Sequence, residues 1–300
     1  MIQDNAILVS HDAGGAEILS LWAKENLKNV VTVLDGPALD IFKKNHPTAK
    51  VLHLKEAMSL PYPVITGTSW QSDLEKKAIK HALINNKYCC TILDHWVNYK
   101  ERFVFNGAQL VPNELWCFDK YALDICRKVF PNIPNKLYKN PYLSAVKQEL
   151  ESLRSILKPR SGNKTNILYL SESIDNHSEA LYNNPSQLCG YTEKDAFSFL
   201  STCLSTVFSD IHSLTVRPHP SQAKSELSWM NSYNHQYNFS ISNELSLCEQ
   251  ILAHDIVIGL ESMALIVAII ANKPVFSAIP PGYRKCVIPF SEITHLSDLI

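Results

Sequence analysis

Two short polar segments in the second half of the chain each follow an apolar run. Arg217-Pro218-His219-Pro220 comes directly after residues 213–216, and Gly259-Leu260-Glu261-Ser262 comes directly after residues 255–258. Both runs have the length and composition of buried strands. Each polar segment is therefore expected at the carboxyl end of a parallel strand, where open α/β sheets bind their ligands.

The side chains of these two segments suit a nucleotide phosphate. Arg217 and His219 could make charge-assisted hydrogen bonds to phosphate oxygens, and the prolines beside His219 restrict its backbone. Ser262 and the N–H groups at the start of the following helix could bind a phosphate as well. Glu261 would repel a phosphate and better suits a sugar hydroxyl. The alternative for Glu261 and Ser262 is that they only cap the helix.

Candidate proton-transfer residues lie in the first half of the chain. The segment His11-Asp12-Ala13-Gly14-Gly15 follows the apolar run 6–10, and Asp94 follows the run 90–93. Carboxylates and imidazoles at strand ends are well placed for general base catalysis. Asp12 is the first choice for the base, followed by His11 and Asp94. The alternative is a tight turn in which Asp12 only caps the helix.

Strand-like and helix-like segments alternate along the whole chain, which predicts an α/β protein with mostly parallel sheets. The segment from Lys158 to Lys164 interrupts this alternation with proline, glycine, serine and charged residues. Such a composition is typical of a linker. We therefore expect two Rossmann-like domains, residues 1–157 and 165–300. Ser171 would end the first strand of the second domain.

The composition excludes several classes of protein. Lys and Arg total 28 against 29 Asp and Glu, so nothing favours nucleic acid as a partner. Eight cysteines without a CxxC pair predict buried, reduced thiols, and no Cys/His set has the spacing of metal ligands. No secretory signal is visible, and the longest apolar run is too short for a membrane span. We expect a cytoplasmic protein without metal or cofactor.

The chain resembles GT-B glycosyltransferases in this organisation. The stretch from Ile256 to Ala264, continuing to Lys273-Pro274-Val275, is similar to that family's donor-site pattern. Arg217-Pro218-His219-Pro220 is similar to the His-Pro motif of bacterial sialyltransferases, polysialyltransferases, Kdo transferases and glycerophosphotransferases. The resemblance implies an active site in a cleft between two domains. It also implies that His219 and Ser262 bind the phosphate of a CMP-type or, alternatively, a UDP-type donor.

The resemblance also assigns tasks to the two domains. Residues 1–157 would face the acceptor, and residues 165–300, with Ser171 at a strand end, would bind the nucleotide-sugar donor. The family's acidic base motif is not matched, although Asp12 stands near that position.

The sequence therefore predicts a metal-independent glycosyltransferase of polysaccharide biosynthesis. It would move a sugar to a glycan or lipid-linked acceptor, with peripheral membrane association. The alternatives are a sugar-nucleotide epimerase or hydrolase of the same fold, or a non-catalytic two-domain sugar-binding protein.

Overall fold

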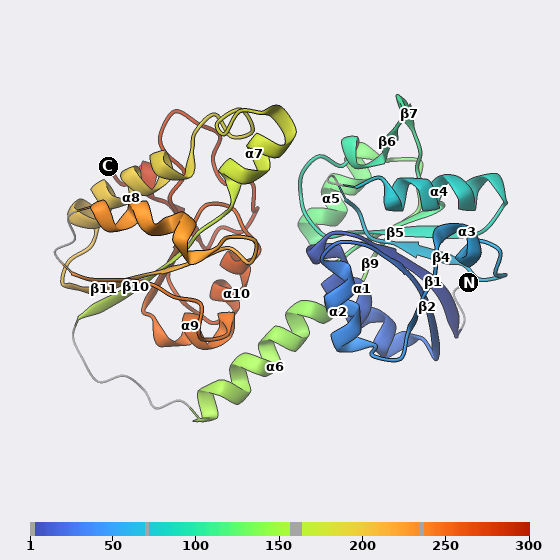
Figure 1. Ribbon diagram of the computed structural model, residues 1–300, viewed down its shortest axis with the longest axis horizontal. Coiled ribbons are helices and arrows are strands. Elements are labelled where there is room, and N and C mark those ends of the chain that lie inside the picture. The colour runs from blue at the N-terminus through green and yellow to red at the C-terminus, as the bar shows by residue number, and fades with distance from the viewer. Residues whose placement is uncertain (1–3, 70–71, 157–163, 234–236) are drawn as a thin grey trace. The chain divides into compact units, whose positions relative to one another are not determined.

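The computed structural model describes residues 4–69, 72–156, 164–233 and 237–300 (Figure 1). The chain divides into two units, Met1–Ser144 and Ala145–Ile300, and the boundary falls inside helix α6 (Pro141–Ile156). Each unit contains a mostly parallel sheet with helices, which confirms the predicted α/β class. The predicted linker, residues 158–164, lies outside the described residues except for Lys164.

A seven-stranded sheet forms the centre of the N-terminal unit, and all of its neighbouring strands are parallel. The strand order reverses between β1 and β4, which is the switch point where doubly wound sheets bind ligands. In spatial order the strands are β3 (Lys50–Val51), β2 (Asn29–Leu34), β1 (Asn5–Ser10), β4 (Val64–Thr66), β5 (Cys89–Leu93), β8 (Glu114–Cys117) and β9 (Asn135–Leu137).

Helices connect most of these strands, and their apolar faces pack on the sheet. Trp22 of α1 contacts Trp116 of β8 with ring centroids 4.7 Å apart, and both side chains are buried. Asp119 caps α5 by accepting a hydrogen bond from the N–H of Ala122. The helices are α1 (Ala13–Asn26), α2 (Ala38–Asn45), α3 (Leu54–Ala57), α4 (Leu74–Ile84) and α5 (Lys120–Val129).

The connection from β5 to β8 contains no α-helix. It consists of a 3-10 turn, η1 (Glu101–Phe103), and an antiparallel hairpin of β6 (Val104–Phe105) and β7 (Ala108–Gln109). Figure 1 shows this hairpin projecting from the N-terminal unit beside α4. Long connections without a helix commonly carry binding residues in such folds.

The C-terminal unit repeats the same strand order in a six-stranded parallel sheet. Its switch point lies between β10 and β13. In spatial order the strands are β12 (Asn238–Ile241), β11 (Ile211–Arg217), β10 (Thr165–Leu170), β13 (Ile256–Gly259), β14 (Val275–Ser277) and β15 (Ile293–His295).

Local capping signals set several helix starts in the C-terminal unit. Thr192 and Asp195 form a capping box at α8, and Ser246 and Glu249 form one at α9. The helical elements are α7 (Ile174–Tyr182), α8 (Glu193–Val207), η2 (Lys224–Ser232), α9 (Leu247–Ala253), α10 (Ala264–Ile270) and η3 (Leu296–Asp298).

The thiols of all eight cysteines are free, and six of these side chains are buried. This agrees with the predicted reduced, buried thiols. Within the described ranges no helix combines the length and the apolar character that a membrane span requires.

Candidate functional site

The N-terminal unit places two predicted residues in one hydrogen-bonded chain at its switch point. Asp12 Oδ1 lies 2.6 Å from His11 Nδ1 and accepts a hydrogen bond from Ser69 Oγ at 2.7 Å. His11 and Asp12 follow β1, whereas Ser69 follows β4. The side chains of His11 and Asp12 are 16% and 17% exposed, so they are sheltered but accessible. Asp12 makes no side-chain bond to cap α1, so the capping alternative is wrong.

The imidazole tautomer follows from these contacts. An ionised Asp12 can only accept hydrogen bonds, so His11 Nδ1 carries the proton in the neutral ring. His11 Nε2 is then left with a lone pair. A pair of this kind can take a proton from a hydroxyl while the carboxylate stabilises the resulting imidazolium.

Two residues outside the predicted set hold His11 in this position. Glu75, in the first turn of α4, accepts the backbone N–H of His11 at 2.7 Å. Gly36 has a left-handed backbone with φ of +54°, and a Cβ there would lie 2.7 Å from His11 Nε2. The imidazole therefore packs directly against a residue that has to be glycine. Neither contact is visible in the local sequence around His11.

Asp94 belongs to a second network beside the first. Its Oδ1 accepts hydrogen bonds from Thr68 Oγ1 and from Arg102 NH1, each at 2.9 Å. The side chains of Asp94 and Arg102 are only 12% and 9% exposed. Asp94 Oδ2 lies 2.6 Å from the place that a Cβ of Gly14 would take. The carboxylate thus fills the space above Gly14 and is held as the partner of a cation.

The same loop carries two aromatic residues that could stack on a sugar ring. Trp96 and Tyr99 are 8% and 3% exposed, and Trp96 Nε1 donates to the carboxylate of Asp119 at 3.0–3.1 Å. Their burial indicates that these two side chains pack inside the N-terminal unit.

In the C-terminal unit, an internal carboxylate occupies the predicted anion-binding turn. Glu172 Oε1 accepts the backbone N–H groups of Leu260, Glu261 and Ser262 at 3.0, 2.8 and 2.9 Å. Burial raises the pKa of Glu172 to about 7, while these three hydrogen bonds act in the opposite direction. The expectation that these N–H groups are free for a phosphate is therefore wrong. Helix α10 also begins later than expected, at Ala264.

Two of the predicted nucleotide-binding side chains have partners within the protein. Glu261 accepts a hydrogen bond from Arg284 NH2 at 2.8 Å, and its side chain is 22% exposed. Arg217 NH1 donates to the carbonyl of Leu245 at 2.8 Å and to Gln250 Oε1 at 2.6 Å. A phosphate role for Arg217 stays a prediction, and it would have to use the other nitrogens of the guanidinium.

His219 presents a defined ring nitrogen. Its Nδ1 lies 2.7 Å from Ser221 Oγ and accepts the N–H of Ser221 at 3.3 Å. Because an N–H can only donate, Nδ1 is unprotonated and the ring proton sits on Nε2. Desolvation, followed by the neighbouring His177, lowers the pKa of His219, which favours this neutral form.

Gln222 ties His219 to the neighbouring strand end. Its Oε1 accepts hydrogen bonds from Ser171 Oγ at 3.1 Å and from the backbone N–H of His219 at 3.2 Å. Its Nε2 donates to Glu193 Oε2 at 2.8 Å. Ser171 is thereby buried as a structural link between β10 and the loop after β11. The sequence placed Ser171 at the correct strand end but did not indicate this partner.

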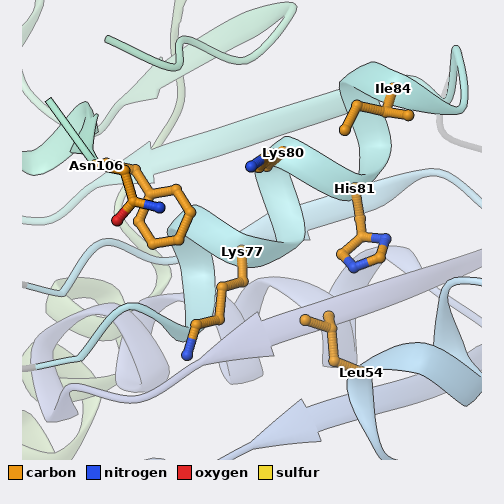
Figure 2. A pocket seen from close by; sticks show the side chains of 7 residues that line it. Leu54, Lys77, Lys80, His81, Ile84 and Asn106 are labelled. Carbon is orange, nitrogen blue, oxygen red and sulfur yellow. The ribbon is translucent and has the colours of Figure 1, made fainter. Parts of the chain in front are cut away.

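The N-terminal unit also has a cavity on the outer side of α4, away from the predicted residues. It has a volume of about 320 Å³ (Figure 2). Figure 2 shows side chains from α4 on one side, Leu54 of α3 below and Asn106 of the hairpin opposite. The cavity is lined by Leu54, Lys77, Lys80, His81, Ile84, Phe105 and Asn106.

In the part of the chain that the structure describes, no three His, Cys, Asp or Glu side chains cluster as metal ligands would. The sequence matches no protein-family model and no curated protein. Solved structures do match it, at low sequence identity and over most of the chain.

Two of these structures contain UDP, one of them together with UDP-GlcNAc. The chain is 10% identical to UDP-GlcNAc 2-epimerase from Methanocaldococcus jannaschii in complex with UDP-GlcNAc and UDP, with a TM-score of 0.59 and coverage of 98% of this chain and 89% of that one. It is 11% identical to MnaA of S. aureus in a structure with UDP, with a TM-score of 0.57 and coverage of 92% and 79%.

The third structure, MurG of Acinetobacter baumannii, is 10% identical, with a TM-score of 0.53 and coverage of 99% and 87%. At these identities the likeness establishes the fold and nothing more. The predicted GT-B-like architecture of two Rossmann-like units is thereby confirmed. The CMP-type specificity that the His-Pro motif implied remains untested.

Proposed function

We propose that the chain is a nucleotide-sugar enzyme in which the His11–Asp12 pair moves the proton. The observation that carries this proposal is the chain from His11 through Asp12 to Ser69 at the switch point of the N-terminal sheet. The GT-B-like fold supports it, since structures with this fold include complexes with UDP and UDP-GlcNAc. The first candidate reaction is transfer of the sugar to an acceptor hydroxyl.

In this reaction His11 Nε2 removes the proton from the acceptor hydroxyl. The oxygen attacks the anomeric carbon of the donor, and the bond from that carbon to the phosphate oxygen breaks. Asp12 holds the ring through Nδ1 and stabilises the imidazolium that forms. General base catalysis of this kind contributes about 10²–10⁴-fold to the rate. Asp12, the first choice from the sequence, thus acts through His11.

The C-terminal unit carries hydrogen-bond donors that suit a nucleotide phosphate. His219 can donate a hydrogen bond from Nε2 to a phosphate oxygen, and Ser262 can donate its hydroxyl. The N–H groups of the turn after β13 take no part, because Glu172 occupies them. Hydrogen-bond donors held in place before the reaction stabilise developing charge without reorganisation.

A binding screen and a turnover assay test this proposal. Thermal shifts with CMP, CDP, UDP, GDP and dTDP identify the base and the number of phosphates, since a ligand stabilises the state that binds it. Turnover is then compared between wild type, His11→Gln, Asp12→Asn and the control Asp40→Asn, which changes an exposed carboxylate of α2. We expect both site variants to lose about 10²–10⁴-fold in kcat. If neither variant loses kcat, the proposed role of the His11–Asp12 pair is rejected.

Epimerisation of a UDP-sugar is the second candidate. Several of the similar structures are UDP-GlcNAc 2-epimerases, including that from Neisseria meningitidis bound to UDP-GlcNAc. An epimerase converts the donor without any acceptor, whereas a transferase does not. Incubation with UDP-GlcNAc alone, followed by NMR of the products, separates the two: a new sugar isomer identifies epimerisation, and released sugar with UDP identifies hydrolysis.

A further inference from the structure

Glu75 is a buried acid directly behind His11. Its side chain is only 1% exposed, and Oε1 accepts the backbone N–H of His11 at 2.7 Å. Oε2 is fully buried and has no hydrogen-bond partner in the described part of the chain. A Cβ on Gly67 would lie 3.8 Å from Glu75 Oε1, an ordinary van der Waals distance, so the carboxyl group lies close to the backbone at the end of β4. A buried carboxyl group with one oxygen unsatisfied is costly and calls for a reason.

The charged groups around Glu75 make it sensitive to pH. His11 and Asp12 act on it electrostatically from the turn after β1. The end of β4 carries hydroxyl groups, and the adjoining β5 carries the buried thiols of Cys89 and Cys90, whose pKa values are raised by burial.

At the N-cap of α4, the exposed Asp73 is paired with Lys76 at 3.0 Å. Burial, the largest effect, raises the pKa of Glu75 to about 7, and its hydrogen bonds act in the opposite direction.

We infer that Glu75 is a positioning residue for His11 and that its protonation state sets the basicity of the His11–Asp12 pair. This inference rests on the proposed function, in which that pair moves the proton. An ionised Glu75 adds a negative charge near the imidazole and stabilises the imidazolium, so His11 becomes a stronger base. A protonated Glu75 removes that stabilisation and still keeps the carbonyl oxygen that holds the His11 backbone.

The coupling predicts a titration that belongs to both groups. Ionisable groups whose charges act on each other each report the other's titration. The ring signals of His11 should therefore show a second step near pH 7, from Glu75, beside the step of the imidazole itself. In Glu75→Gln only the step of the imidazole should remain. Its midpoint should lie at a lower pH than in wild type, because the neighbouring negative charge is gone.

The experiment follows the histidine ring signals of the full chain by ¹H–¹³C NMR as a function of pH. The spectrum of His11→Gln identifies the His11 signal among the eleven histidines. The matched control is Asp73→Asn, which removes an exposed carboxylate two residues away, at the N-cap of α4, and should keep both steps. A single-step titration of His11 in the wild type overturns the inference, whether or not Glu75→Gln folds.

The titration needs no substrate, so it stands apart from the proposed function. If wild type titrates in two steps and the chain turns over a nucleotide sugar, the kcat profile of wild type should bend near pH 7 and that of Glu75→Gln should not. Identical kcat profiles overturn the link between Glu75 and catalysis. If the chain turns over no nucleotide sugar, the proposed function is rejected. The result of the titration then still decides whether Glu75 and His11 are coupled.

Discussion

Replacing Gly14 with alanine should destabilise the N-terminal unit through Asp94. The new Cβ would lie 2.6 Å from Asp94 Oδ2, whereas ordinary contact begins at about 3.4 Å, an overlap of about 0.8 Å (3.4 − 2.6). Asp94 must therefore move away from Thr68 Oγ1 and Arg102 NH1, which it now contacts at 2.9 Å each. Because the Arg102 side chain is 9% exposed, its charge would lose a buried partner.

The expected magnitude follows from these contacts. Loss of a hydrogen bond to a charged group costs about 1.5–3 kcal/mol. Alanine in place of glycine in a helix returns about 0.5–1 kcal/mol. Gly14→Ala should therefore lower the free energy of unfolding by about 0.5–2.5 kcal/mol. Urea unfolding followed by tryptophan fluorescence measures it as a shift of the midpoint at unchanged slope.

Gly15→Ala is the matched control. It lies next in the same helix, but its Cβ would meet nothing nearer than 3.4 Å, the Cα of Gly67. The only expected effect is then the stabilisation from replacing a glycine in a helix with alanine. The variant should therefore be as stable as wild type or more stable by up to about 1 kcal/mol. Equal stability of the two variants would refute the reasoning, because the difference between them depends on Asp94. The double variant Gly14→Ala/Asp94→Ala should show no further loss from the Gly14 change.

Three further changes have defined outcomes. Gly36→Ala combines a left-handed backbone with a 2.7 Å contact to His11 Nε2, so it should displace the ring and lower both stability and turnover, which a crystal structure and the turnover assay would check. His219→Ala should weaken nucleotide binding by about 1.5–3 kcal/mol in a calorimetric titration while the fold survives, and unchanged affinity would remove its phosphate role. Glu193→Gln tests pH dependence: burial raises the pKa of the Glu193 carboxyl to about 7, so the unfolded chain ionises first. Wild type then loses stability as the pH rises from about 4.5 to about 7, and the variant does not. The variant should therefore gain about 3 kcal/mol relative to wild type across that window, measured by urea unfolding at each pH.

Most strands of both sheets were predictable because parallel strands buried on both faces are continuous apolar runs, whereas the short edge strands β9 and β15 were not expected. Residues 6–10 and 166–170 show such runs, and they form β1 and β10 at the centres of the sheets. The β6–β7 hairpin was missed because it has only two residues per strand, although the turn residues Asn106 and Gly107, both with positive φ, are typical of a hairpin. Helix α2 was missed as well, because its eight residues begin after Pro37 without a side-chain cap.

The candidate site was predictable only in part, because its geometry depends on partners that are distant in sequence. His11 and Asp12 are adjacent, so their pairing could be expected from the strand end alone. Glu75 is 64 residues away from His11, and Glu172 reaches a turn 88 to 90 residues further along. Both contacts depend on which strands are neighbours at the switch points. Nothing in the local residue pattern specifies that choice.

Arg217 shows that strand alternation contains information that motif spacing does not. In β11 the side chains of Leu214 and Val216 are fully buried, whereas Thr215 and Arg217 lie on the opposite, half-buried face. Alternation thus directs Arg217 to the face where Gln250 of α9 accepts a hydrogen bond from Arg217 NH1. His219 lies beyond the last strand residue and is free of that alternation. Of the two basic side chains that make the Arg-Pro-His-Pro segment resemble a phosphate site, Arg217 uses one guanidinium nitrogen to link β11 to α9. The His219 ring, with its proton on Nε2, is therefore the stronger candidate for binding a phosphate.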